Sequence, residues 1–350
     1  MPISSDSSRF LRQLPKAELH LHLEGALLPQ RVMSLAEKYS VPLNWNDIHS
    51  RYNTRGFSQF LDLYKWATSF LREPADYALL AQDAATVLHE QGVVYAEITL
   101  SIGVMLLRKQ NVVANFQSLK EVFTQNAKSG TGPQVQFIFD AVRQFGPAPA
   151  MEVARITAEL RREGVVAFGL GGDELSLPLS DFRESYDYAA KHGLHLLAHA
   201  GEMGGPEQIT EAINILGVER IGHGIAAIRS DALMNTLAER KIPLEICPTS
   251  NVRTNALNIQ LNAANANLSQ HPLPKLFRHG IPITLSTDDP ALFHTTLVEE
   301  YSAALGAGLT MHELLAINRA AFEYSFLPVA ERQSLLDAFP ETGEAAAGKQ

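Results

Sequence analysis

The sequence lacks several features that common classes of protein require. Cys247 is its only cysteine among 350 residues, which excludes an intrachain disulfide and a cysteine-rich zinc site. No apolar run is long enough to cross a membrane, and the polar segment 1–12 has no signal-peptide core. The formal net charge of −9 argues against binding to nucleic acid or an anionic membrane. We therefore expect a cytoplasmic protein, and the sequence leaves its oligomeric state open.

Motifs of several hydrolase classes are also absent. There is no HExxH of zinc proteases and no GxSxG nucleophile elbow. The HxE and PCxxC pair of the cysteine-ligated zinc deaminases is missing as well. Cys247 has no histidine beside it in the sequence, so we predict a small buried residue rather than a nucleophile.

Short apolar segments alternate with longer amphipathic ones, which predicts an α/β protein. Strands that are apolar nearly throughout are typical of a parallel sheet buried on both faces. Eight such units favour a (β/α)8 TIM barrel, in one domain over 1–340, rather than an open doubly wound sheet. The expected strands are 17–23, 93–100, 135–140, 165–169, 194–200, 220–222, 244–247 and 281–286.

The gap between the first two strands is unusually long. Its segments 29–39, 57–70 and 76–91 have helical periodicity. A helical insertion after a barrel strand lies over the C-terminal mouth, where active sites form. We therefore predict a helical lid inserted after the first strand, over approximately 26–92. The small, polar segment 341–350 is predicted to be a disordered tail.

Ionisable residues follow four of the predicted strands. His20 and His22 are two positions apart, so they project from the same face of a strand. The C-terminal ends of barrel strands meet at one rim, so the groups after them should lie together. They are His20 and His22 after the first strand, His199 and Glu202 after the fifth, His223 after the sixth, and Asp288 and Asp289 after the eighth.

This set of side chains predicts a metal site. Three imidazoles, from His20, His22 and His199, and one of the two aspartates suit a divalent metal. Zinc fits best, and the same ligands also hold iron or cobalt. A bound metal generates hydroxide from water near neutral pH, while Glu202, His223 and the other aspartate would be free for proton transfer and orientation.

One metal is expected rather than two. Two-metal barrel hydrolases often use a carboxylated lysine from the fourth strand as a bridging ligand, and the segment 165–174 contains no lysine. Two other interpretations remain. A barrel with a purely structural metal would not need Glu202, His223 or a second aspartate, and an ester or lactam hydrolase would need neither Glu202 nor the loop around Gly172.

These motifs together resemble the adenosine/adenine deaminase family of amidohydrolase-type barrels. The resemblance implies a zinc-dependent hydrolase that replaces the 6-amino group of a purine by oxygen and releases ammonia. The segments that carry it, in order, are 16–25 with HxHLEG, 169–174 with GGDE, 199–202 with HAGE, 220–224 with GHG, 247–251, and 286–290 with TDDP.

The resemblance also implies a role for each matching residue. Phe57, Phe60 and Leu61 share a helical face and resemble the family's apolar wall over the base, although ordinary core packing explains the spacing equally well. The implied metal ligands are His20, His22, His199 and Asp288. The implied substrate contacts are Glu202 with purine N1, Asp289 with N7, the Gly172 N–H with N3 and Glu24 with the N9 substituent, while His223 supports the hydroxide.

The resemblance leaves the 6-aminopurine itself open. We place adenosine, converted to inosine, first. The alternatives are 6-amino-6-deoxyfutalosine of menaquinone biosynthesis, adenine and N6-methyl-AMP. Glu24 stands where classical adenosine deaminases tend to carry Asp, and 95–104 resembles members assigned to aminodeoxyfutalosine. The benzoate of that substrate could pair with Arg143 or Arg108.

Overall fold

A closed parallel barrel forms the centre of the molecule. The computed structural model describes residues 5–337, and its eight strands pair in sequence order from β1 to β8. The sheet closes where Leu21 bridges to Asp288, whose N–H donates to the His20 carbonyl (3.0 Å). The predicted (β/α)8 TIM barrel is confirmed. The strands are β1 Lys16–His22, β2 Val93–Leu100, β3 Gln134–Val142, β4 Val165–Gly171, β5 His195–Ala200, β6 Arg220–His223, β7 Leu244–Ile246 and β8 Ile283–Leu285.

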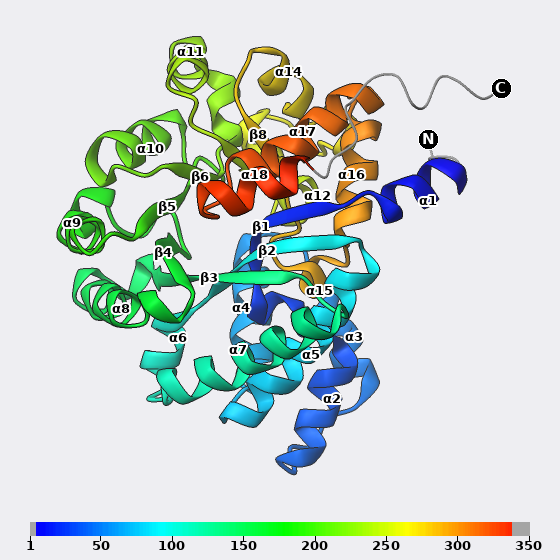
Figure 1. Ribbon diagram of the computed structural model, residues 1–350, viewed down its shortest axis with the longest axis vertical. Helices are drawn as coiled ribbons and strands as arrows, with labels where there is room; N and C mark the ends of the chain where they lie inside the picture. The colour runs from blue at the N-terminus through cyan, green and yellow to red at the C-terminus, as the bar shows by residue number, and fades with distance from the viewer. Residues whose placement is uncertain (1–4, 338–350) are drawn as a thin grey trace.

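Helices surround the strands, and α8 to α11 follow one another around the outside (Figure 1). No helix within residues 5–337 has both the length and the apolar character needed to cross a membrane. The first nine are α1 Ser5–Gln13, α2 Pro29–Lys38, α3 Trp45–Tyr52, α4 Phe57–Thr68, α5 Pro74–Glu90, α6 Ile102–Leu107, α7 Val112–Ser129, α8 Pro147–Glu159 and α9 Arg183–Lys191. The others are α10 Pro206–Glu211, α11 Asp231–Arg240, α12 Pro248–Arg253, α13 Ala256–Gln260, α14 Leu273–Arg278, α15 Pro290–Phe293, α16 Leu297–Gly306, α17 Met311–Glu323 and α18 Val329–Asp337.

The three helices expected between the first two strands are present, and they have different positions. They correspond to α2, α4 and α5, and the sequence did not predict α3 between them. Helix α4 contributes residues to the pocket at the barrel mouth. Helix α5 packs along α7 instead, as a barrel helix does. We therefore restrict the predicted lid to the part of the insertion around α4. The expected tail at 341–350 lies outside the described residues.

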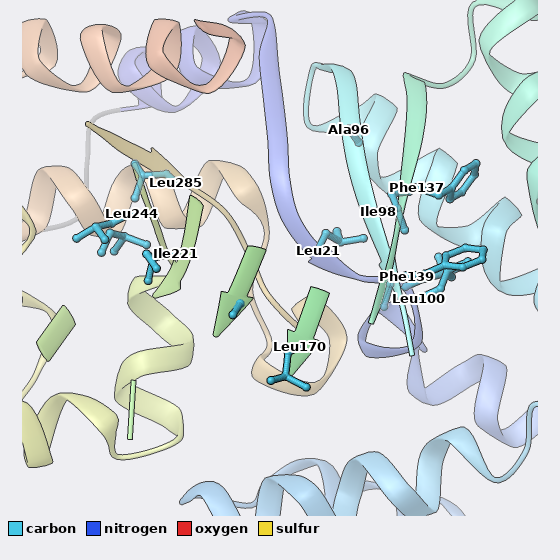
Figure 2. Close-up of a cluster of buried hydrophobic side chains, with 14 of the residues drawn as sticks. Leu21, Ala96, Ile98, Leu100, Phe137, Phe139, Leu170, Ile221, Leu244 and Leu285 are labelled. Atoms are coloured by element: carbon cyan, nitrogen blue, oxygen red, sulfur yellow. The ribbon is translucent and has the colours of Figure 1, made fainter. Parts of the chain in front are cut away.

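The outward face of each strand is apolar and packs against the helices. Figure 2 shows such side chains from β1, β2, β3, β4, β6, β7 and β8. They include Leu21, Ile98, Phe139, Leu170, Ile221, Leu244 and Leu285, and each is at most 3% exposed. Burial of this apolar layer on both strands and helices stabilises the barrel and fixes which face of each strand turns inward.

The inward faces are apolar only at the N-terminal end of the barrel. There Ala17, Leu19 and Tyr95 pack against Phe322 of α17. These contacts place α17 beneath the strands, at the end opposite to the mouth. This apolar layer closes the bottom of the barrel.

A buried ion-pair chain occupies the middle of the barrel. Arg220 of β6 lies between Glu97 of β2 (2.5 Å) and Glu245 of β7, whose Oε1 is 2.7 Å from Nε but poorly aligned for a hydrogen bond. The Phe326 ring centroid lies 3.7 Å from the guanidinium carbon. A charged layer here replaces the branched aliphatic residues usual in such barrels.

Removing the cation of this chain should destabilise the fold strongly. Arg220→Met leaves Glu97 and Glu245 buried without their counter-ion, so we expect the free energy of unfolding to fall by about 3–5 kcal/mol. Arg319→Met removes an exposed pair with Glu323 and should change it by less than about 0.5 kcal/mol. Urea unfolding of both variants measures the difference. Equal small losses would show that the buried chain adds no more than a surface pair.

Candidate active site

Donor atoms of three histidines and one aspartate converge at the C-terminal mouth of the barrel. His22 Nε2 lies 3.2 Å from His199 Nε2 and 3.4 Å from Asp288 Oδ1. His20 Nε2 lies 3.4 Å from the same carboxylate oxygen. The structure therefore brings the four expected ligands together from β1, β5 and the residues after β8.

An irregularity in β1 aims its two histidines at this point. The pairing with β2 shifts register between Glu18 and Leu21. Before the shift Leu19 belongs to the apolar bottom layer, and after it His20 and His22 project into the mouth. A bulge that redirects side chains beside a functional site is a common device in barrels.

Hydrogen bonds hold the other ring nitrogen of two ligands. His20 Nδ1 lies 2.7 Å from Glu245 Oε2, and His199 Nδ1 lies 3.2 Å from the Leu170 carbonyl oxygen. Each ring therefore donates its Nδ1 proton in these hydrogen bonds, and the lone pair of Nε2 faces the mouth of the barrel. Acceptors that bind the other ring nitrogen in this way orient metal-binding imidazoles and raise their basicity.

The donor set fits one transition-metal ion. His20 Nε2 is buried and, within residues 5–337, has no hydrogen-bond partner. Such an unpaired buried nitrogen is costly unless something binds it. Three imidazole nitrogens and a carboxylate oxygen match the preferences of zinc. His223 also comes close, with Nε2 3.8 Å from Asp288 Oδ2, so distance alone does not exclude it as a ligand.

The pKa values of the adjacent aspartates are shifted in opposite directions. Burial would raise the pKa of Asp288, but the His20 ring and the other nearby imidazoles hold that pKa well below its usual value. Burial and the charge of Asp288 raise the pKa of Asp289 well above its usual value. The shifts favour an ionised Asp288, as an expected metal ligand must be, and Ser250 Oγ lies 2.6 Å from its Oδ2.

Three strained or crowded backbone positions make this arrangement fit. His223 and Asp288 have positive φ angles of 61° and 67°, which are uncommon for residues other than glycine and concentrate at functional sites. Gly25 leaves room for Asp289, because a Cβ at position 25 would lie 2.0 Å from its Oδ1. The glycine of the HLEG motif is therefore required by contact with the acid across the mouth.

Hydrogen bonds hold the loop that carries Glu202 through both its backbone N–H groups and its carbonyl groups. Its backbone N–H groups at Glu202, Met203 and Gly204 donate to the carboxylate of Glu174 at 3.1, 2.6 and 2.7 Å. The Gln260 amide donates to the carbonyls of Glu202 and Gly204. Burial and the nearby Asp288 raise the pKa of Glu202 well above its usual value, which favours its protonated form.

A pocket extends from these groups towards α4. Phe57, Phe60 and Leu61 all line it, as their spacing predicts, and Phe60 packs on Phe293 with 4.8 Å between ring centroids. Gly172 lines the opposite side at φ 95°, where a Cβ would lie 2.3 Å from the Gln144 side-chain oxygen. Only glycine therefore fits without displacing that side chain.

Glu24 lies behind the pocket wall rather than among its lining residues. It is 2% exposed, and its Oε1 accepts a hydrogen bond from the Ser101 backbone N–H at 3.1 Å. The Ser101 hydroxyl is in turn 2.7 Å from the Tyr64 hydroxyl, and both of these residues line the pocket. Burial raises the pKa of Glu24 to about 7.

The two arginines expected near a substrate carboxylate are engaged elsewhere. Arg143 donates to the Leu177 carbonyl (2.7 Å) and to Gln208 (2.9 Å). Arg108 donates to the Thr68 carbonyl at the end of α4. Neither lines the pocket. Among the described lining residues, Lys65 of α4 is the one lysine or arginine.

Sequence reasoning missed Asp140, which lies near the C-terminal end of β3 and lines the pocket near His22 and His199. Burial raises its pKa to about 8. Its position requires glycine in β4, since a Cβ at Gly169 would lie 1.9 Å from Asp140 Oδ1. A carboxylate that ends the apolar run 135–140 was the available signal.

Comparison with known proteins gives one consistent family. The profile described as adenosine deaminase matches residues 15–342. The chain is 34% identical over 341 residues to an aminodeoxyfutalosine deaminase of Streptomyces coelicolor, covering 96% of this chain and 86% of that protein. It is 36% identical over 323 residues to an adenine deaminase of Chelativorans sp., covering 92% and 97%. The crystal structure of an adenine deaminase from Arthrobacter aurescens superposes with a TM-score of 0.84 at 28% identity, covering 92% and 97%.

Metal analysis should separate the ligands from the neighbouring histidine. We expect one equivalent of metal per chain in the purified protein, and its loss from His22→Ala. His223→Ala should keep the metal, because His223 is predicted to act on the water and not as a ligand. Elemental analysis after desalting measures both. Metal loss from His223→Ala together with retention by His22→Ala would contradict the assignment.

Proposed function

Because the chain belongs to the adenosine deaminase family, we propose that it is a metal-dependent hydrolase that replaces the 6-amino group of a purine by oxygen. The proposal rests on one observation above all. The carboxyl groups of Glu202 and Asp289 line the same pocket as the histidines and Asp288 that converge at the barrel mouth. A purine has acceptors at N1 and N7, and two carboxyl groups of raised pKa can donate to them in their protonated form.

Each residue then has a defined task. A zinc ion held by His20, His22, His199 and Asp288 would activate a water molecule. Glu202 gives its proton to N1, which makes C6 electrophilic, and Asp289 donates to N7. The water oxygen adds to C6; one proton of the water restores Glu202 and the other passes to the 6-amino group. The C6–N6 bond then breaks, ammonia leaves and a 6-oxopurine remains.

The neighbouring groups position the ring and the water. The Gly172 N–H lies on the pocket wall, where it can donate to N3 of the purine. His223 is 3.8 Å from Glu202, so it stands next to the path of the attacking oxygen. An ester or lactam hydrolase would need only the metal and a base. The two further carboxyl groups in the pocket, Glu202 and Asp289, favour a heterocycle with several ring nitrogens.

The names of the relatives favour the alternatives over adenosine. The two relatives described above are named for aminodeoxyfutalosine and adenine, so adenosine is not our first choice. The pocket supports the larger of the two: Phe57, Phe60 and Tyr64 form an aromatic wall suited to a benzoate, and Lys65 is available for its carboxylate. We propose aminodeoxyfutalosine, with adenine as the second candidate. Zinc as the native metal and a cytoplasmic location are part of this proposal.

A substrate panel with a single acid variant tests the reaction. The zinc-loaded protein should convert aminodeoxyfutalosine faster than adenine or adenosine, followed by the change in purine absorbance. Glu202→Gln keeps a hydrogen-bond donor but has no proton to transfer, so kcat should fall by about 10²–10⁴-fold. Glu207→Gln, an exposed change in the first turn of α10, should leave kcat unchanged. No turnover of any 6-aminopurine by the metal-loaded protein would overturn the proposal.

Lys65 distinguishes the two candidate substrates. Lys65→Met should lower kcat/KM for aminodeoxyfutalosine by up to about fivefold, the range of a solvent-exposed charge pair. It should leave adenine, which has no carboxylate, unchanged. Lys128→Met on α7 provides the control for a general change of charge. An equal effect of Lys65→Met on both substrates would show that the carboxylate does not reach α4.

A further inference from the structure

A chain of buried hydrogen bonds leads from outside the pocket to His223. The backbone N–H of Leu273 donates to His271 Nδ1 at 3.1 Å. His271 Nε2 lies 3.2 Å from Asn251 Oδ1, and Asn251 Nδ2 lies 3.2 Å from His223 Nδ1. The three side chains are at most 3% exposed. None of the roles discussed above uses His271 or Asn251.

The direction of each bond follows from its first donor. A backbone N–H can only donate, so His271 Nδ1 is the acceptor and carries no proton. Burial lowers the pKa of His271 to about 3, which keeps the ring neutral and its proton on Nε2. That proton points to Asn251, whose oxygen must face it. The Asn251 amide group is then turned so that its N–H donates to His223 Nδ1.

The last hydrogen bond, from Asn251 to His223, determines which nitrogen of His223 is protonated. Its Nδ1 is occupied as an acceptor, so a neutral ring has its proton on Nε2. Nε2 faces the reaction side, 3.8 Å from both Glu202 Oε2 and Asp288 Oδ2. We propose that Leu273, His271 and Asn251 form a relay that fixes His223 as the Nε2–H tautomer, so that His223 donates a hydrogen bond to the attacking oxygen and does not accept its proton.

This assignment deepens the proposed function and rests on it for the identity of the attacking oxygen. It assigns the transferred proton to Glu202, whose Oε2 lies 3.8 Å from His223 Nε2. Asn251 and His271 are positioning residues, because they act through His223. Asn251 belongs to α12 and His271 to the segment between α13 and α14, and neither is among the described residues that line the pocket.

The tautomer can be read directly in the unmodified protein. We would label histidine with ¹⁵N, load the protein with zinc and record long-range ¹H–¹⁵N spectra, with His223→Gln to assign the signals. The expected result is a non-protonated Nδ1 and a protonated Nε2 for His223, and the same for His271. A protonated Nδ1 at His223 would overturn the proposal. This measurement requires no substrate, so it tests the tautomer of His223 independently of whether the protein is a deaminase.

A single isosteric change should reverse the relay. In Asn251→Asp a carboxylate accepts from His271 and from His223, so the proton of His223 moves to Nδ1 and its Nε2 loses the donor. We expect kcat to fall on the order of 10²-fold, as for loss of one donor to a developing oxyanion. KM should stay within about threefold, because ground-state binding is unchanged. Metal content should equal that of the parent protein.

A matched pair elsewhere supplies the control. His279 Nε2 lies 2.8 Å from Asn235 Oδ1 in an exposed histidine–asparagine pair, and neither residue lines the pocket. Asn235→Asp should change neither kcat nor the His223 signals. Retention of full kcat by Asn251→Asp with the reversed tautomer would overturn the role in catalysis. If Asn251→Asp does not fold, the spectrum of the unmodified protein still decides the tautomer.

Discussion

When one nitrogen of an imidazole ring is held by a hydrogen bond, only the other nitrogen can bind a metal or a substrate. This constraint organises three of the active-site histidines, His20, His199 and His223. Nδ1 of His20 is held by Glu245, Nδ1 of His199 by a backbone carbonyl, and Nδ1 of His223 by Asn251. In each case Nε2 is the atom that faces the mouth of the barrel. The partner decides the ring's character: acceptors at His20 and His199 leave Nε2 with a lone pair for a metal, while a donor at His223 leaves Nε2 with a proton.

The same constraint links the site to the stability of the barrel. Glu245 binds His20 with one oxygen and approaches Arg220 with the other, and Arg220 continues to Glu97 on the far side of the interior. Buried charges of this kind are weak contributors to stability as a whole, although breaking one is costly. A barrel filled only with aliphatic residues could be as stable. The charged layer is better explained by the acceptor that His20 needs, and the metal ligands are thus oriented by residues of the barrel's middle layer.

The sequence predicts those parts that depend on one segment or on a rule about strand ends. All eight strands were expected within two residues of their observed bounds, because their outward faces are apolar. The clusters at His20, His199 and Asp288 were expected to meet because parallel strands of a barrel end at one rim. Features that depend on contacts between distant segments were not predicted: the bulge in β1, the place of Asp140 against Gly169, and the relay from His271. Glu24 was expected beside the substrate, but it lies behind the pocket wall.

The central claim is that a water oxygen replaces the 6-amino group of a purine in this pocket. The most direct measurement is mass spectrometry of the purine product after turnover of aminodeoxyfutalosine in ¹⁸O-labelled water by the zinc-loaded protein. The account predicts one ¹⁸O atom at C6 and one ammonia released for each product formed. Unchanged aminodeoxyfutalosine, adenosine and adenine, or a 6-oxopurine without the label, would contradict it.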